Sequence, residues 1–301
     1  MTNNEMTIAF LLLAHHQPEH TGRLVRMLDD PRHHFFIHVD KQTDLSWFRK
    51  KATVKGENVH FLTDRNRFKI NWGGFNMLKA TLRLVETAWQ SPLQFGRFCL
   101  LSGSDYLLKS QADMRTALAE DIEYIRIDRM LSDHQSDTHS HNIEHFFFPD
   151  NPILKSFRLS GRFHRRPYDG IALYHGSQWW ALSRRAISFI LDFLEKNPAY
   201  TQFHRYVNCP DEIFFASMLK STPFADRISH DFEARQLMDP TLFGAHYIDW
   251  CLCSNDGRSP KILTEDDYEK LYRSEALFAR KFDEESSAIL LQKIDRCLGK
   301  Y

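Results

Sequence analysis

The sequence predicts an α/β fold with a mostly parallel central sheet flanked by helices. Short apolar runs typical of buried strands alternate with stretches of helical periodicity, and polar residues follow the runs. The first run, residues 8–13, is apolar throughout, as expected for a strand covered on both faces. Further strands are expected at residues 35–39, 59–62, 98–101 and 124–127, and helices at residues 19–28, 75–89 and 185–195.

The helix expected at residues 75–89 shows the clearest periodicity. Its apolar side chains Met77, Leu78, Leu82 and Val85 fall at the spacing of one helix face. Ligands of such α/β sheets bind beyond the carboxyl ends of the strands, so the polar residues there are site candidates. They include His15, His16, Asp40, Arg65 and Asp105. Neither a GxGxxG fingerprint after the first strand nor a GxxxxGK[ST] phosphate loop is present.

Regular periodicity fades between about residues 128 and 175, which we interpret as an irregular insertion lying over the sheet. Its histidines from His134 to His145 could ligate a metal, but no carboxylate or cysteine stands at matching spacing, which favours a solvated polar loop. The adjacent Trp179 and Trp180 follow on an expected strand and should point to opposite faces. One should enter the core and the other could stack on a sugar ring, although the area of aromatic side chains alone favours burial of both in the core.

Two adjacent carboxylates, Asp211 and Glu212, stand at an expected helix start. Pro210 suits the first turn of a helix, where the dipole also favours acidic side chains. The apolar run at residues 213–219 should anchor that helix in the core and hold the carboxylates at its exposed end. A carboxylate so placed could act as a general base, although both residues could also serve only as helix caps.

Composition limits the class of protein. Lysine plus arginine and aspartate plus glutamate number 39 each among the 301 residues, so no overall charge favours a nucleic-acid partner. The five cysteines are scattered and odd in number, as in reduced cytosolic proteins. Residues 1–6 lack a basic leader, and the apolar run at 8–14 is too short to span a bilayer. We therefore expect a cytoplasmic protein, with peripheral association at the inner membrane face left open.

Several segments together resemble the core-2/I-branching β-1,6-N-acetylglucosaminyltransferase family, which includes the peptide O-xylosyltransferases, and most closely its bacterial members. The matching segments cover nearly the whole chain: residues 14–16, 37–41, 71–74, 101–106, 176–180, 209–215 and 278–283. The resemblance implies a single GT-A glycosyltransferase domain, Rossmann-like, over residues 1–301. It also implies transfer from a UDP-sugar with inversion and without a divalent metal, so no cofactor is expected.

The resemblance also implies residue roles. Glu212 would be the base, and Arg258 and Lys281 would neutralise the pyrophosphate in place of a metal. Asp40 and His15 or His16 would contact the uridine, with Arg65 at the ribose or the phosphates. The acceptor or donor sugar would be contacted by Asp105, Trp180 and Asp211.

The animal enzymes carry a membrane-anchored stem and a disulfide framework that this chain lacks. We therefore expect a bacterial enzyme of surface polysaccharide synthesis that acts on a glycan or a lipid-linked glycan. GlcNAc, xylose and glucuronic acid stay open as donor sugars. Alternatives are a metal-dependent transferase that uses Asp105 and a histidine, and a non-catalytic nucleotide-sugar-binding protein. A glycoside hydrolase using Asp211 and Glu212 is disfavoured, because its carboxylates would need to lie roughly 5 to 10 Å apart across the substrate.

Overall fold

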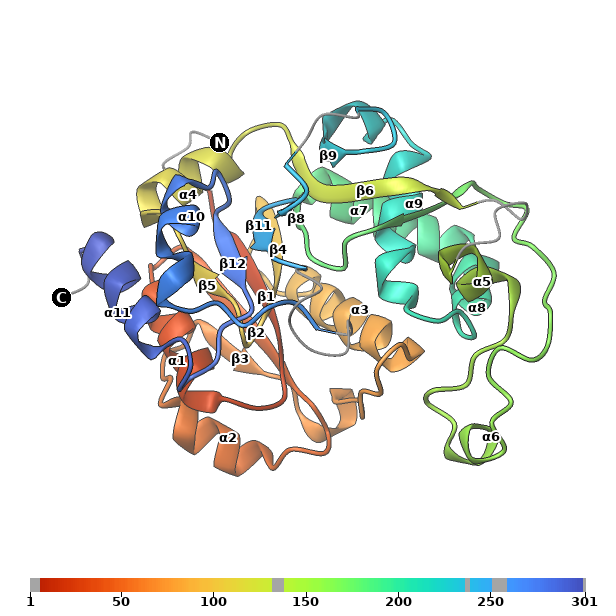
Figure 1. Ribbon diagram of the computed structural model, residues 1–301, viewed down its shortest axis with the longest axis horizontal. Coiled ribbons are helices and arrows are strands. Elements are labelled where there is room, and N and C mark those ends of the chain that lie inside the picture. Colours follow the sequence, from red (N-terminus) through yellow and green to blue (C-terminus); the bar gives the residue numbers. More distant parts are fainter. Residues whose placement is uncertain (1–5, 132–137, 236–238, 251–258, 300–301) are drawn as a thin grey trace.

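A large central sheet organises the computed structural model, which describes residues 6–131, 138–235, 239–250 and 259–299. Among these residues the sheet has eight strands in the order β3-β2-β1-β4-β8-β6-β7, with β9 paired to β6 (Figure 1). Strands β1 to β4 pair in parallel, whereas β8 is antiparallel to β4 and to β6. The strands are β1 (Ile8–Ala14), β2 (His33–Val39), β3 (Val59–Phe61), β4 (Arg97–Ser102), β6 (Glu123–Leu131), β7 (Leu173–Gly176), β8 (Ala181–Ser183) and β9 (Ile228–Asp231). The expected mostly parallel sheet is confirmed.

Strand β1 is covered on both faces, as its apolar run predicts. Ile8, Phe10 and Leu12 pack into one core, which they share with helices α1, α2, α4 and α11. Ala9 and Leu11 pack into the opposite core, together with helices α3, α7, α8 and α9. The helices are α1 (Pro18–Met27), α2 (Leu45–Ala52), α3 (Phe75–Trp89), α4 (Gln111–Leu118), α7 (Arg184–Lys196), α8 (Pro198–His204), α9 (Phe214–Lys220), α10 (Tyr268–Arg273) and α11 (Ala288–Cys297). No described helix is both long and apolar enough to cross a bilayer.

A smaller sheet lies beside the first and was not expected from the sequence. Its order within the described residues is β10-β11-β12-β5, and it joins the chain after Ser102 to the C-terminal third. Its strands are β5 (Tyr106–Leu107), β10 (Leu242–Phe243), β11 (His246–Ile248) and β12 (Phe278–Arg280). Strands of two or three residues are too short to show a periodicity of two in the sequence.

The insertion expected at residues 128–175 is more regular than predicted. Its ends belong to strands β6 and β7, which pair with each other. Helices α5 (Thr138–Glu144) and α6 (Pro152–Ser156) lie between them. Figure 1 shows α6 at the end of a lobe that projects from the rest of the molecule. His134, one of the histidines considered as a metal ligand, lies outside the described residues.

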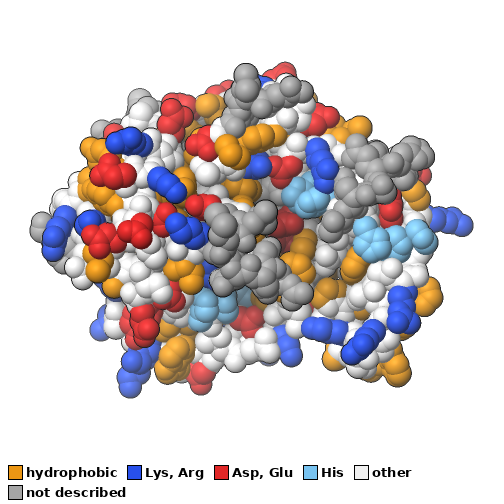
Figure 2. All heavy atoms as spheres, viewed as in Figure 1, with side chains coloured by type: hydrophobic (Ala, Val, Ile, Leu, Met, Phe, Trp, Pro, Cys, Tyr) orange, Lys and Arg blue, Asp and Glu red, His pale blue; other side chains and the backbone are white. Residues whose placement is uncertain are grey.

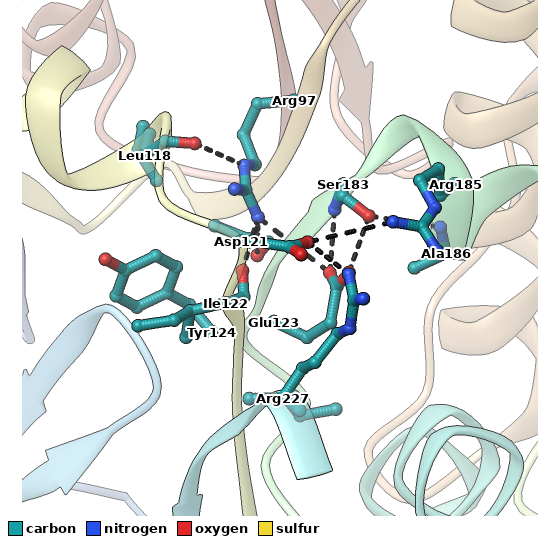
Figure 3. Close-up of polar contacts among 12 residues, drawn as sticks. Arg97, Leu118, Asp121, Ile122, Glu123, Tyr124, Ser183, Arg185, Ala186 and Arg227 are labelled. Atoms are coloured by element: carbon teal, nitrogen blue, oxygen red, sulfur yellow. Dashed lines mark hydrogen bonds and ion pairs between the residues drawn. The ribbon is translucent and has the colours of Figure 1, made fainter. Parts of the chain in front are cut away.

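A buried ion pair ties the two halves of the central sheet together. Arg97 of β4 and Glu123 of β6 are 3.8 Å apart, and their side chains are 3% and 1% exposed. Arg97 also donates hydrogen bonds to the backbone carbonyls of Leu118, Glu120 and Ile122. Glu123 accepts from the backbone N–H and the hydroxyl of Ser183 (Figure 3). The pair thus fixes β6, which supplies site residues, to the parallel strands.

Candidate active site

A cavity of about 790 Å³ lies beyond the carboxyl ends of β1, β2 and β4. Ala14, Asp40 and Ser102 line it from these strand ends, and Asp211 and Glu212 line it from the opposite side. Cavities of roughly 300–1,000 Å³ hold small-molecule and cofactor ligands in proteins. The strand-end rule used on the sequence therefore predicts the position of this cavity.

Glu212 lies in a 3₁₀ turn, η2 (Pro210–Glu212), which ends just before α9 begins at Phe214. The sequence predicted one continuous helix from Pro210. Ile213, between the turn and α9, has φ −117°, away from the helical value, and separates them. Before the turn, Cys209 has a positive φ of 50°, and its N–H donates to the carbonyl of Gly73. The side chains of Phe214 and Phe215 are buried and anchor α9 in the core. The carboxylate of Glu212 is left 36% exposed, facing the cavity.

His175 connects Glu212 to a second carboxylate. Its Nε2 lies 3.5 Å from an oxygen of Glu212, and its Nδ1 lies 2.8 Å from an oxygen of Asp128. Strands β6 and β7 bring these residues together by antiparallel pairing. Arg126 adds a 2.5 Å hydrogen bond to Asp128. Burial opposes a charged ring, but the hydrogen bond to Asp128 and the nearby carboxylate of Glu212 raise the pKa of His175 to about 9.

The two adjacent acids of the turn have different surroundings. Burial, and then the charge of Glu212, raise the pKa of Asp211. The side chain of Glu212 is 36% exposed and lies 3.5 Å from His175 Nε2. The geometry therefore presents the carboxylate of Glu212 to the cavity as the candidate proton acceptor.

Cations approach the cavity from β12. The guanidinium of Arg280 lines the cavity and lies 4.2 Å from the ring centre of Trp179. Lys281 does not line the cavity, but its ammonium donates a 3.2 Å hydrogen bond to the hydroxyl of Ser259, which does. Burial, and then the charge of Arg280, lower the pKa of Lys281. Arg258 lies outside the described residues.

Of the residues expected to contact the uridine, Asp40 and His15 line the cavity and His16 does not. Asp40 lines the cavity, and its carboxylate accepts hydrogen bonds from the backbone N–H groups of Gln42 and Ile70. His15 also lines the cavity, and its ring stacks on that of His16 at 3.9 Å between centres. His16 itself is not among the lining residues.

The structure corrects the expected sugar contact at Trp180. Its side chain is fully buried and packs on Phe215 in the core, whereas Trp179 lines the cavity. The alternation of a strand places the two rings on opposite faces, but it does not tell which face is the core.

Asp105 does not reach the cavity either. Its carboxylate is fully buried and accepts a 2.7 Å hydrogen bond from the N–H of Ser102. It also lies 3.2 Å from His246 Nε2 and 3.7 Å from Arg280 Nε. Asp105 can therefore influence a ligand through Arg280 and Ser102, which both line the cavity.

The expectation for Arg65 is corrected as well. Its side chain is exposed and does not line the cavity. The neighbouring Arg67 is buried and donates to the carbonyls of Val39, Asp40 and Thr43. The arginine of this segment that matters to the site therefore acts by positioning the Asp40 loop.

Sequence reasoning missed several residues that line the cavity. Arg126 and Asp128 lie at or just after the end of an expected strand, so the rule applied to the other strands would have found them. His175 and Trp179 lie on either side of the glycine at position 176. Their only signal in the sequence was that they stand next to or within the matching segment at residues 176–180.

Comparison with known proteins agrees with the resemblance seen in the sequence. Residues 8–272 match the family model "Branch: Core-2/I-Branching enzyme". The chain is 26% identical over 317 aligned residues to xylosyltransferase oxt of Drosophila pseudoobscura pseudoobscura, with 98% of this chain and 34% of that protein covered. It is also 26% identical to human xylosyltransferase 1, over 100% of this chain and 31% of that protein. The chain thus spans about a third of the length of these curated relatives.

A solved structure with an overall likeness is the galactosyltransferase LgtC in complex with donor and acceptor sugar analogs. The TM-score is 0.41 and the identity 9%, with 98% of this chain and 96% of that chain covered. A likeness of this size decides nothing about fold or function.

Proposed function

The chain belongs to the Core-2/I-Branching enzyme family of glycosyltransferases, and from this premise we propose that it transfers a sugar from a UDP-sugar to a hydroxyl of a glycan acceptor. The transfer inverts the anomeric carbon and needs no divalent metal. The observation that carries the proposal is the carboxylate of Glu212, open to the cavity and paired with His175.

In the proposed reaction Glu212 accepts the proton of the acceptor hydroxyl as its oxygen attacks the anomeric carbon. The bond from that carbon to the β-phosphate oxygen breaks in the same step, and its electron pair leaves with UDP. A single displacement of this kind inverts the carbon and needs one base on the acceptor side. His175 orients Glu212, and Asp128 in turn orients His175.

The leaving UDP gains negative charge that must meet positive groups. Arg280 lines the cavity and Lys281 reaches its edge through Ser259. By family resemblance, Arg258 is a further cation that would neutralise the pyrophosphate. Fixed cations at the leaving group can supply the stabilisation that a metal supplies elsewhere.

The arrangement around Asp105 supports a metal-free reaction over a metal-dependent one. Divalent cations such as Mg²⁺ and Mn²⁺ usually need several oxygen ligands. One oxygen of Asp105 accepts from Ser102 and faces His246, and the other faces the guanidinium of Arg280. A second cation would compete with Arg280 for this carboxylate.

For the substrates we propose xylose or GlcNAc as the transferred sugar, since the curated relatives are named xylosyltransferases. For the cellular role we propose synthesis of a bacterial surface polysaccharide on a glycan or lipid-linked glycan. The enzyme would act in the cytoplasm, at the inner face of the membrane.

Calorimetric titration of the full chain with UDP, UDP-xylose and UDP-GlcNAc, in EDTA and again in excess Mn²⁺, tests the donor and the metal independence. Equal affinity in both buffers supports the proposal, and the tightest sugar identifies the donor. Binding that appears only with Mn²⁺ would contradict it. Lys281→Ala should weaken UDP binding. Lys50→Ala, at an exposed position of α2, is the matched control.

A further inference from the structure

The lobe that carries α6 has an ordered base. The N–H of Phe146 donates to the carbonyl of Phe163, and the N–H of Gly161 donates to the carbonyl of Phe146, both at 2.9 Å. One step along, the N–H of Arg165 donates to the carbonyl of Glu144 at 2.8 Å. The two arms are therefore joined by backbone hydrogen bonds, and helix α6 projects beyond them (Figure 1). We term residues 151–166 the basic tip; it comprises α6 and the second arm of the base.

The basic tip holds large apolar side chains in solvent. Ile153, Phe157 and Phe163 are 66%, 67% and 53% exposed. The first two project from or just beyond α6, whose start is fixed by the side chain of Asn151, which accepts from the N–H groups of Ile153 and Leu154. Scattered exposed apolar residues are normal, but three gathered on one short projecting segment indicate a contact surface.

The charge of the same segment is entirely positive. It contains Lys155, Arg158, Arg162, Arg165 and Arg166 and no aspartate or glutamate, in a chain whose formal net charge is zero. Of these five, all but Arg165 are exposed. None of them forms an ion pair with another described residue. In Figure 2 the corner that corresponds to the α6 lobe shows Lys and Arg side chains together with hydrophobic ones.

We propose that the basic tip docks on the surface of an anionic lipid bilayer. Exposed apolar side chains that enter the boundary of the acyl chains, surrounded by basic residues that meet lipid phosphates, are the combination that interfacial membrane binding requires. The cations without carboxylates match an anionic surface better than a mixed protein surface. In this proposal the membrane contact is made by a single segment, the basic tip.

Docking there would set the cavity near the bilayer. Asp150, which directly precedes the basic tip, accepts hydrogen bonds from Asn71 and Asn76. Trp72 lies between them, lines the cavity and is 67% exposed. The link to a lipid-linked acceptor rests on the proposed function, whereas docking itself does not depend on transfer.

Flotation of the full chain with vesicles tests the docking. We expect binding to phosphatidylcholine vesicles that contain phosphatidylglycerol, at least about tenfold tighter than to phosphatidylcholine alone and weakened by salt. The triple variant Ile153→Ser, Phe157→Ser, Phe163→Ser should bind at least about tenfold more weakly. The control Tyr272→Ser, Ile289→Ser changes apolar side chains that are 63% and 56% exposed elsewhere and should bind as the parent does.

Several results would overturn the proposal. The parent chain could fail to float with anionic vesicles, or the triple variant could float as well as the parent. Preferential binding of the parent to single-stranded RNA over vesicles would assign the basic tip to nucleic acid. Phe157→Ser alone repeats the test with the smallest change, should the triple variant misfold. UDP calorimetry on the same proteins separates the two proposals. A parent chain that binds UDP but not anionic vesicles overturns docking alone, whereas a triple variant that loses vesicle binding at unchanged UDP affinity supports docking.

Discussion

The proton on His175 should contribute measurably to stability, and His175→Gln removes it. Burial disfavours the charged ring, but Asp128 and Glu212 outweigh this and raise its pKa from 6.5 to about 9. The side chain is only 14% exposed, so solvent screens the interaction little. At ~1.4 kcal/mol per pKa unit, the shift corresponds to about 3 kcal/mol.

The sign follows from the direction of the shift. A folded-state pKa above the unfolded value means that the contribution is fully present below the unfolded pKa of 6.5. It is then lost as the pH rises through about 9. Between about pH 6 and about pH 10 the parent should therefore lose about 3 kcal/mol more unfolding free energy than His175→Gln.

Urea unfolding of both proteins at the two pH values measures this difference. Repeating the comparison with Asp211→Asn in both proteins removes the titration of the neighbouring acid. An equal pH dependence of parent and variant would refute the proposed role of the imidazolium. The transfer rate gives a second readout, because the parent should lose activity above about pH 9 and the slower variant should lack that alkaline decline.

Three further predictions use other parts of the site and fold. Trp180→Ala should lower the unfolding free energy by about 3–5 kcal/mol through a core cavity, whereas Trp179→Ala should lower it by less and raise a substrate KM roughly tenfold; the reverse pattern would contradict the assignment. Arg97→Ala should cost about 3–5 kcal/mol in denaturant unfolding, because it leaves Glu123 charged and buried, and a loss near zero would contradict this. Arg280→Met should weaken UDP binding by about tenfold or more in calorimetry, and unchanged affinity would remove it from the phosphate site.

Sequence periodicity predicted the elements whose own residues carry the signal. Helix α3 begins and ends where its apolar spacing indicated, and β1 is buried on both faces as its unbroken apolar run required. What the sequence could not show is which strands meet. Asp128 and His175 are 47 positions apart and come together only because β6 and β7 pair.

The predictions for Trp180 and Asp105 were wrong for the same reason, because the sequence does not show which segments pack together. Trp180 and Trp179 are adjacent and both buried, but only the tertiary packing decides that Trp180 lies on Phe215 in the core while Trp179 borders the cavity. Asp105 follows a strand as a ligand-binding residue would, yet His246 and Arg280 from a sheet with very short strands enclose it. Long-range packing, rather than local pattern, therefore separates the residues that touch a ligand from those that position them.

The central claim, that Glu212 is the catalytic base, is tested most directly by the rate of sugar transfer in Glu212→Gln. The amide keeps the size of the side chain but cannot take the acceptor proton. We expect the rate of transfer to fall by at least about a hundredfold, as is usual when a general base is removed, with UDP affinity within about twofold of the parent. Transfer at the parent rate with intact UDP binding would contradict the account.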